Sequence, residues 1–462
     1  MAMKIQQSTT ETEKCIDLIN DLGIEFVRYE LYDMNSVARS KTYPARHFQS
    51  CVKSGISFPH DFLVFDTQGN NPETHLSKKY LFSDMLFYPD LSTVTVLPWV
   101  EDTARVFLSV SLVGEGDKVT IDPRNIAQAQ LTALEERKIS LLSSFEYEFW
   151  VVEGKSRKTI TEGLNICSTL RLAEYQKLFN SIAKNLYKAG VDIERLETEY
   201  APGQFEMPIK PSFGIRAADN AATFRTGVKE MAKQQGFSAS FMTKLFKDQE
   251  GSSGHLNHSL WSLDRQTPLH SDKSRPNGLS KMGEHWIAGL LAHAPALSLL
   301  QSPSLNCRDT FRLDTFAPSN ATWGVDNRTC AVRLKRTGVH GSYIENRLGS
   351  SAGNPYISLA AMIAAGIDGI DRKLPLPEAV PFNKPSSDEA SIPPGTVPLP
   401  NDIDGALKSL TEDTVLCKAF GFDFIQAFRT VKMHEKKLLS SYCGDKNEDA
   451  YKWFKEFYFD YI

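Results

Sequence analysis

The sequence predicts an α+β protein with a small strand-rich N-terminal domain and a larger domain that mixes helices with strands. Its 462 residues exceed the length of one typical domain, so two or three domains are expected. The first hundred residues contain strand-like runs, among them "LVFD", "STVTVLPW" and the apolar "TARVFLSVSLV". Long helical patterns then alternate with strands, and we therefore place a boundary between domains of residues 1–103 and 104–462.

The larger domain contains helical patterns whose ends carry start and stop signals. Asn354 is suited to cap a helix and Pro355 to occupy its first turn, while Gly190 and Gly236 are suited to end two earlier helices. Residues 374–400 carry eight prolines and are predicted to form a loop. The predicted helices cover residues 122–138, 168–189, 216–235, 280–300 and 354–370, and predicted strands cover residues 139–152 and 237–245.

The composition is that of an ordinary soluble globular protein. Apolar residues make up 41% and charged residues 23% of the chain, and the formal net charge is -4. This charge gives no reason to expect nucleic acid or an anionic membrane as a partner, and no apolar run reaches the length of a membrane span. The polar N-terminus lacks a signal-peptide core, and the seven cysteines include no CxxC pair. We therefore expect reduced thiols and a cytoplasmic location.

Two glutamates, Glu146 and Glu148, lie in the otherwise apolar run "SSFEYEFW". In a strand they share one face, with Cβ atoms roughly 7 Å apart. At that distance two carboxylates repel by roughly 2 kcal/mol at an effective dielectric constant of about 20, and burial adds a desolvation cost. A divalent cation would remove this penalty, whereas a half-solvated edge strand is the alternative interpretation.

Two further glutamates, Glu199 and Glu206, flank a Pro-Gly turn in "ETEYAPGQFEMP". A hairpin-like reversal of the chain there would bring their carboxylates together. An ordinary acidic turn is the alternative and, for this segment alone, the favoured interpretation.

The stretch "GSSGHLNHSL" holds two histidines, His255 and His258, in a run that also contains glycines. In an extended chain, residues two apart share a face and residues three apart do not. His255 would therefore point away from His258 and share its face with Asn257. Gly251 and Gly254 allow close backbone approach beside His255, although a histidine beside glycines is more often structural than a metal ligand.

Charged side chains recur in two segments of the last third of the chain. Arg328 and Arg333 in "DNRTCAVRLK" could clamp phosphate or carboxylate, with a solvated cationic face as the alternative. Glu345 and Arg347 in "YIENRLGSSAGNPY" share a strand face, with a simple ion pair as the alternative. Carboxylates and one histidine on separate strands suit hard divalent cations, and nearby arginines suit phosphoryl transfer. Since the chain has no Walker motif and no GxGxxG unit, these residues predict a two- or three-metal site with phosphate-binding arginines.

These segments, in this order, resemble the type I glutamine synthetase family over nearly the whole chain. Several sparse motifs in register make a strong signal, whereas any one of them alone would not. Within that family, "STVTVLPW" and "HSLW" resemble the lengsin subgroup. The motifs that carry the resemblance are "DMNSVARSKTYPARHF", "SDMLFYPDLSTVTVLPW", "FEYEF", "ETEYAPGQFE", "GSSGHLNHSL", "NRTCAVR", "ENRLGSSAGNPY" and "EFYFDYI".

The resemblance implies a small N-terminal β-grasp domain and a large catalytic domain with a curved, mainly antiparallel sheet flanked by helices. It also implies a dodecamer of two hexameric rings with active sites between neighbouring subunits. In the implied reaction, ATP phosphorylates the γ-carboxylate of glutamate, and ammonia or an amine then displaces the phosphate. The resemblance thus implies ATP as co-substrate and two or three Mg²⁺ or Mn²⁺ ions per site.

Each metal ligand of the family pattern has a counterpart in this chain. The resemblance assigns one metal to Glu148, Glu199 and Glu206, and a second metal to Glu146, His255 and Glu345. It assigns the transferred phosphate to Arg328 and Arg333, the nucleotide to Ser259 and Asn257, and the acid substrate to Gly251 and Arg347. Asp66, in "VFDTQG", matches the aspartate that reaches a neighbouring subunit's site and helps to deprotonate the amine.

Five positions depart from the family pattern, and two of them are Glu250, which replaces an asparagine beside the acid substrate, and Asn257, which replaces a second histidine. Thr310 stands where an arginine holds the glutamate carboxylate, and Arg308 or Arg312 is available to substitute for it. Phe316 stands where a flap glutamate helps to bind ammonium; this change removes an ammonium site and favours a bulkier, apolar amine. Tyr343 replaces an arginine on the nucleotide side.

Two functions from different classes follow. The intact metal set predicts a ligase that joins a small-molecule acid to an amine other than ammonia, forming a γ-glutamyl or related amide. The substitutions at Thr310, Phe316 and Tyr343 instead favour a ring-forming structural protein without turnover, a scaffold or chaperone with filament proteins as partners. Neither function involves nucleic acid or a membrane. The apolar C-terminal "EFYFDYI" is predicted to dock on a neighbouring subunit and support the ring.

Overall fold

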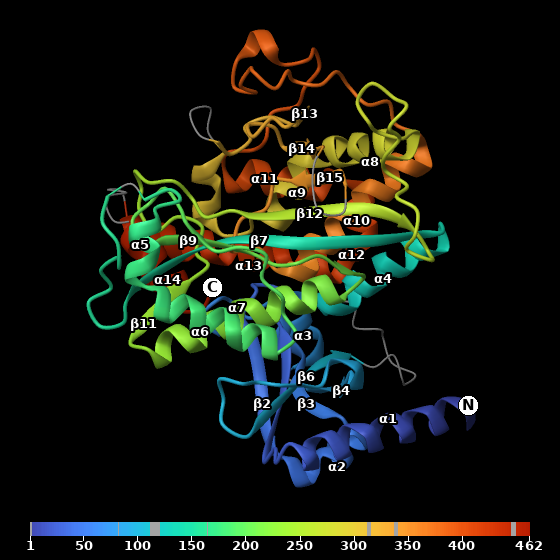
Figure 1. Ribbon diagram of the computed structural model, residues 1–462, viewed down its shortest axis with the longest axis vertical. Coiled ribbons are helices and arrows are strands. Elements are labelled where there is room, and N and C mark those ends of the chain that lie inside the picture. Colours follow the sequence, from blue (N-terminus) through green and yellow to red (C-terminus); the bar gives the residue numbers. More distant parts are fainter. Residues whose placement is uncertain are drawn as a thin grey trace.

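The computed structural model describes residues 2–81, 83–110, 121–163, 165–311, 316–336, 341–444 and 450–462. Two β-sheets organise this part of the chain, a smaller one near the N-terminus and a larger one that begins at residue 139 (Figure 1). Helices pack against the larger sheet and against one another. The α+β class predicted from the sequence is therefore confirmed.

The N-terminal sheet has six strands in the order β2-β1-β6-β4-β3, with β5 also pairing with β6. Strands β1 and β6 run parallel and the other pairs run antiparallel, which agrees with the predicted β-grasp domain. The helices of this region are α1 (Ala2–Asp21), α2 (Phe48–Ser54) and α3 (His75–Tyr80). The strands are β1 (Phe26–Tyr32), β2 (Ala38–Pro44), β3 (Ile56–Pro59), β4 (Asp84–Pro89), β5 (Thr95–Val96) and β6 (Thr103–Val110).

The predicted domain boundary at residue 103 falls at the start of a strand of this first sheet. Thr103 begins β6, where it pairs with Phe26 of β1. Strand β6 also pairs with β4 and β5, so it cannot be separated from the N-terminal sheet. We therefore propose a boundary between Val110 and Ile121, after which the helix α4 (Pro123–Glu136) packs against the larger sheet.

The larger sheet has nine strands in the order β13-β14-β15-β12-β7-β9-β8, and β10 and β11 also pair with β7. All pairs are antiparallel except β13 with β14, as expected for a mainly antiparallel sheet. Strand β7, which carries Glu146 and Glu148, lies between β12 and β9, so the edge-strand alternative is wrong. The strands are β7 (Ile139–Glu153), β8 (Glu197–Thr198), β9 (Gln204–Pro208), β10 (Ser212–Phe213), β11 (Phe237–Ser240), β12 (Gly254–Ser262), β13 (Trp323–Val325), β14 (Val332–Lys335) and β15 (Tyr343–Asn346).

The predicted helices are present, although two of them are interrupted. The helix predicted over 168–189 is broken at Tyr175, and the one predicted over 280–300 is broken at His293, because Pro295 lacks the N–H that would continue the helix. Asn354 caps α10 by accepting hydrogen bonds from the N–H groups of the first turn. No helix in the described ranges combines the length and apolarity needed to cross a membrane. The helices are α5 (Thr169–Glu174), α6 (Gln176–Lys188), α7 (Arg216–Gln234), α8 (Lys281–Ala292), α9 (Ala294–Gln301), α10 (Pro355–Arg372), α11 (Ile403–Glu412), α12 (Thr414–Phe420), α13 (Phe422–Cys443) and α14 (Ala450–Tyr458).

Three predicted strands are wrong or shorter than expected. The run "LVFD", residues 63–66, is not a strand, since Leu63 ends a 3-10 helix and the next three residues have no regular structure. In "STVTVLPW" only Thr95–Val96 pairs, and the strand predicted over 237–245 ends at Ser240. Short apolar runs do not distinguish a strand from a buried turn, because periodicity needs more residues to be decisive. Residues 111–113 of "TARVFLSVSLV" lie outside the described residues.

The C-terminal segment packs on its own chain, so a neighbouring subunit is not needed to bury its apolar side chains, and docking on a neighbour stays a prediction. The carbonyl of Ile462 accepts hydrogen bonds from the Phe241 N–H at 3.0 Å and from the Ser240 hydroxyl at 3.3 Å. The Tyr458 hydroxyl donates to the Glu435 carboxylate at 2.9 Å and accepts from a backbone N–H. The aromatic and aliphatic side chains that are buried there belong to residues 453, 454, 457, 458, 459 and 462.

A buried histidine joins four helices. His293, at the junction of α8 and α9, contacts Asp413 at 2.6 Å through Nδ1 and Asp368 at 3.0 Å through Nε2. Asp368 belongs to α10, and Asp413 is the N-cap of α12. Burial lowers the pKa of His293, but the hydrogen bonds and charges of the two carboxylates outweigh it and raise the pKa above its ordinary value. The two carboxylates therefore favour the imidazolium form of His293 at this junction.

Candidate active site

One pocket, with a volume of about 590 Å³, collects most of the residues that the sequence singled out. Its floor comes from strands β7, β9, β12 and β15, and its walls come from the loops around residues 166, 251, 310 and 328. The predicted site residues that line it are Glu146, Glu148, Glu199, Glu206, Gly251, His255, Arg328, Arg333, Glu345 and Arg347. Segments far apart in the sequence therefore meet in one cavity.

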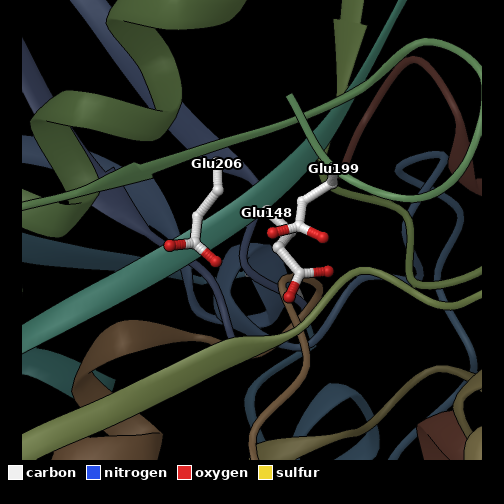
Figure 2. A group of neighbouring side chains, drawn as sticks. All are labelled: Glu148, Glu199 and Glu206. Carbon is white, nitrogen blue, oxygen red and sulfur yellow. The ribbon is translucent and has the colours of Figure 1, made fainter. Parts of the chain in front are cut away.

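Glu148, Glu199 and Glu206 form a carboxylate triad in this pocket. Glu148 on β7 pairs directly with Glu206 on β9, and the N–H of Glu199 donates to the Gln204 carbonyl, which closes the hairpin that the Pro-Gly turn predicted. Each contributes a ligand oxygen, and these oxygens all lie within 4.8 Å of one another. Figure 2 shows the three carboxylates extending into the same space.

The triad carries more negative charge than its surroundings balance. Burial and the charge of Glu199 raise the pKa of Glu148 to about 8. Burial likewise raises the pKa of Glu199 to about 7. Oxygen ligands at this spacing suit a hard divalent cation, which would lower these pKa values by compensating the charge. The triad therefore fits Mg²⁺ or Mn²⁺.

Glu146, His255 and Glu345 form a second group, called here the histidine group. His255 on β12 pairs directly with Glu146 on β7, and its Nδ1 lies 3.3 Å from a Glu345 oxygen. That nitrogen is buried and makes no hydrogen bond to the described residues. Burial and the Arg347 charge lower the pKa of His255 to about 4, so the ring is neutral at pH 7 and its Nδ1 can bind a metal. Among the described residues only the triad brings its ligand atoms within 4.8 Å of one another, so a second cation at the histidine group stays a prediction.

Two buried arginines balance the histidine group. Arg333 donates to one Glu345 oxygen at 3.1 Å, and Arg347 donates to the other at 2.6 Å. Burial alone would raise the pKa of Glu345, but Arg347 and the other nearby cations lower it to about 2. Arg328 is exposed on the pocket wall. Its guanidinium is therefore accessible to a phosphate, as predicted, whereas Arg333 is engaged by Glu345.

Several residues discussed from the sequence do not line the pocket. Asn257 donates to Glu146 at 2.9 Å, so it orients a carboxylate of the histidine group. Ser259 accepts a hydrogen bond from the Trp261 indole, and Tyr343 packs beneath Lys335. Asp66 is fully buried in the N-terminal region. Its carboxylate accepts hydrogen bonds from Asn70 of its own loop, so this conformation does not present it to a neighbouring subunit.

His258 faces the opposite side of the sheet from His255, as strand alternation predicted. Its Nε2 accepts a hydrogen bond from the Trp286 indole at 2.9 Å, and its ring is buried against α8. Burial lowers the pKa of His258 to about 3, so this histidine is a neutral core residue. The two histidines of "GSSGHLNHSL" thus have separate roles.

The end of the pocket around Gly251 is built differently from the family pattern. A Cβ at Gly251 would lie 2.7 Å from the Thr310 methyl, so the missing side chain leaves just enough room for that threonine. Arg308 does not substitute for the missing arginine, because its guanidinium donates to the Ser298 and Ser302 carbonyls and faces away from the pocket. Arg312 lies outside the described residues. Lys244 is buried on the pocket wall, and its Cγ would lie 3.4 Å from a Cβ at Gly251.

Two aromatic rings lie at the pocket mouth. The Phe316 side chain is 53% exposed, and its ring centroid lies 6.2 Å from that of Tyr200. Both residues line the pocket. They create an apolar contact surface where the family pattern places a carboxylate.

Arg195 is a site residue that the sequence reasoning missed. It lines the pocket and forms salt bridges to Glu146, Glu197 and Glu206. A signal was available, since Arg195, Glu197 and Glu199 alternate in "ERLETEY" and would share one face of an extended chain.

Comparison with known proteins supports the same interpretation. The model of the glutamine synthetase catalytic domain matches residues 120–451. The chain belongs to the glutamine synthetase family. It is 37% identical to lengsin of Homo sapiens over 418 residues, which cover 89% of this chain and 80% of lengsin. It is 26% identical to a glutamate–isopropylamine ligase of Pseudomonas sp. over 460 residues, covering 95% of this chain and 97% of that enzyme.

A solved structure shares the fold of the whole chain. It is described as apo GmaS without ligand and matches with a TM-score of 0.82 and 25% identity, over 96% of this chain and 98% of that one. The chain therefore carries the catalytic domain of an ATP-dependent ligase family that acts on small-molecule acids and amines.

Proposed function

We propose that this glutamine synthetase relative is an ATP- and divalent-metal-dependent ligase that joins glutamate or a related acid to an amine other than ammonia. The observation that carries the proposal is the meeting of the carboxylate triad, the histidine group and Arg328 in one pocket. Such a set of oxygen and nitrogen ligands beside an accessible arginine suits phosphoryl transfer to a carboxylate.

The two metal groups have distinct tasks in this proposal. The triad holds one Mg²⁺ or Mn²⁺ ion and the histidine group holds another, and the bound ions would neutralise the phosphates of ATP. Asn257 fixes the orientation of Glu146 through its hydrogen bond. Arg328 stabilises the charge of the transferred phosphate, while Arg333 holds Glu345 in place. Ser259 and Asp66 have no contact with substrate in this proposal.

The acid is expected to bind at the Gly251 end of the pocket. Arg347 and Lys244 supply positive charge there, and Thr310 occupies the space that a larger side chain would take. The amine is expected to enter past Phe316 and Tyr200, whose rings favour an apolar substituent over ammonium. The Pseudomonas relative is named for an apolar amine, isopropylamine, which is consistent with this choice.

Phosphate release is the direct test. The purified chain, MgATP or MnATP and glutamate would be combined with ammonium, methylamine, isopropylamine and larger amines, and the amide product identified by mass spectrometry. We expect metal-dependent phosphate release that is faster with apolar amines than with ammonium. No metal-dependent release with any acid and amine of a broad panel would refute ligase activity.

A matched pair of variants tests the role assigned to Phe316. Phe316→Glu places a carboxylate at the pocket mouth and should shift kcat/KM toward ammonium, whereas Phe316→Leu should keep the preference for apolar amines. An equal effect of both substitutions on all amines would show that the ring contributes only to packing.

A structural role without turnover is the second candidate, and the similarity to lengsin favours it. It requires the assembly, proposed as two hexameric rings, but not the catalytic cycle. Light scattering would establish the oligomeric state, and co-sedimentation with filament proteins would test partner binding. An assembled protein that binds filaments and releases no phosphate would favour this candidate. A cytoplasmic location stays a prediction.

A further inference from the structure

Arg195 lies between the two metal groups. Its Nη2 is 3.0 Å from a Glu146 oxygen, and the same nitrogen contacts Glu206. Its Nε donates to Glu197 at 2.7 Å. Glu146 belongs to the histidine group and Glu206 to the triad, so one guanidinium joins a ligand from each group.

We propose that Arg195 is a tethered counter-ion of the metal centre: it holds the two groups together in the metal-free chain and moves toward solvent when divalent cations bind. This inference rests on the proposed metal binding and adds to it a residue that controls metal affinity. Arg195 then competes with the divalent cations for the oxygens of Glu146 and Glu206.

The exposure of the partners indicates which of them can move. The Arg195 side chain is 42% exposed, whereas those of Glu146 and Glu206 are 9% and 6% exposed. The two carboxylates are fixed on paired strands of the sheet, and Arg195 precedes β8 in a connecting segment. The long arginine side chain can therefore swing out without disturbing the sheet, while the carboxylates stay in place.

Charge explains why the arginine and the metals compete. Of the cations in the described part of the chain, Arg195 alone forms a salt bridge to a member of the triad. A divalent ion bound by Glu206 or Glu146 would use the same oxygens and would repel the guanidinium at short range. Without metal, loss of Arg195 would remove a salt-bridge partner from both Glu146 and Glu206, which destabilises the fold.

Metal titration of variants tests the proposal without relying on turnover. Mn²⁺ binding would be measured by calorimetry or by the electron paramagnetic resonance of free Mn²⁺, using wild type, Arg195→Gln and Arg195→Lys. We expect Arg195→Gln to bind Mn²⁺ at least about tenfold more tightly than wild type, and Arg195→Lys to lie between the two. In EDTA the Gln variant should have a lower Tm, and Mn²⁺ should raise its Tm more than that of wild type.

Arg171→Gln is the matched control, because Arg171 has the same 42% side-chain exposure and a salt bridge to Glu174 but does not line the pocket. It should leave Mn²⁺ affinity and the response to EDTA unchanged. Equal or weaker Mn²⁺ binding by a folded Arg195→Gln variant would overturn the inference while leaving the ligase proposal standing. Tight binding by the variant together with no phosphate release by wild type would support the inference and refute the ligase proposal.

Discussion

Glu148→Gln tests how much the carboxylate triad lowers the stability of the metal-free fold and how much Mn²⁺ binding restores. The Glu148 carboxylate accepts hydrogen bonds from the Ser253 N–H at 3.1 Å, from the Gln204 amide at 3.0 Å and from the Ser253 hydroxyl. A glutamine can keep all three contacts, because its oxygen accepts the first two and its amide donates to the hydroxyl. The substitution therefore removes charge with little change in shape.

The magnitude follows from the pKa of Glu148, which is about 8 in the folded chain against an ordinary 4.5. Since the folded state holds the proton more tightly, the cost to folding is absent below about pH 4.5, grows as the pH rises and levels off above about pH 8. Each pKa unit corresponds to about 1.4 kcal/mol, so the whole difference would correspond to about 5 kcal/mol. The partial exposure of Glu148 and the coupling of its titration to that of Glu199 reduce this difference. We therefore expect the Glu148 charge to destabilise the metal-free fold by about 2 kcal/mol.

Denaturant unfolding in EDTA would measure this difference. Glu148→Gln should be more stable than wild type by about 2 kcal/mol at pH 8 and equal to it near pH 4.5, and Mn²⁺ should stabilise the wild type more than the variant, which keeps only the histidine group intact. Glu153→Gln is the control, because Glu153 is exposed at the end of the same strand. A Glu148→Gln variant that loses the same stability at both pH values, or that Mn²⁺ stabilises as it does wild type, would refute the reasoning.

Three further predictions concern the C-terminus, the helix junction and the pocket. Tyr458→Phe removes a hydrogen bond to the buried Glu435 and should cost about 2 kcal/mol in urea unfolding, without changing the oligomeric state seen on a sizing column. His293→Gln should be less stable than wild type below its ordinary pKa of 6.5, and the difference should vanish as the pH rises through the raised pKa of the folded state. Gly251→Ala should lower Tm, because the new Cβ would lie 2.7 Å from the Thr310 methyl; Thr310→Ser in the same chain should restore most of the loss.

The metal side of the site could be predicted from the sequence because strand periodicity is strict. Residues two apart share a face, so the separation of His255 from His258 and the shared face of Glu146 and Glu148 follow from their spacing in the chain. The Pro-Gly turn indicated that Glu199 and Glu206 come together, whereas the pairing of Glu148 with Glu206 joins two strands far apart in the chain and was not predicted. The shared strand faces depend on local geometry, and the register of distant strands does not.

The substrate side could not be predicted in this way. The orientation of Arg308 depends on carbonyls of α9 and the segment after it, which no local pattern reveals. The burial of Asp66 depends on how its loop closes on itself, and the packing of the C-terminal segment depends on hydrogen bonds from Ser240 and Phe241, far away in the chain. An apolar tail must be covered, but its sequence does not say whether its own chain or a neighbour covers it.

The cost of the triad bears on the choice between an enzyme and a scaffold. Three carboxylates whose oxygens lie within 4.8 Å of one another lower the stability of the metal-free fold, and neutral side chains would stabilise it. A ring whose only task is to remain assembled gains nothing from this arrangement unless a cation occupies it. Arg195 contacts Glu206 but not Glu148 or Glu199, so most of the charge is left for an external ion. The ligase and the structural ring protein therefore both require a bound cation at the triad. They differ in whether the two ends of the pocket, altered at Thr310 and Phe316, still bind an acid and an amine beside that cation.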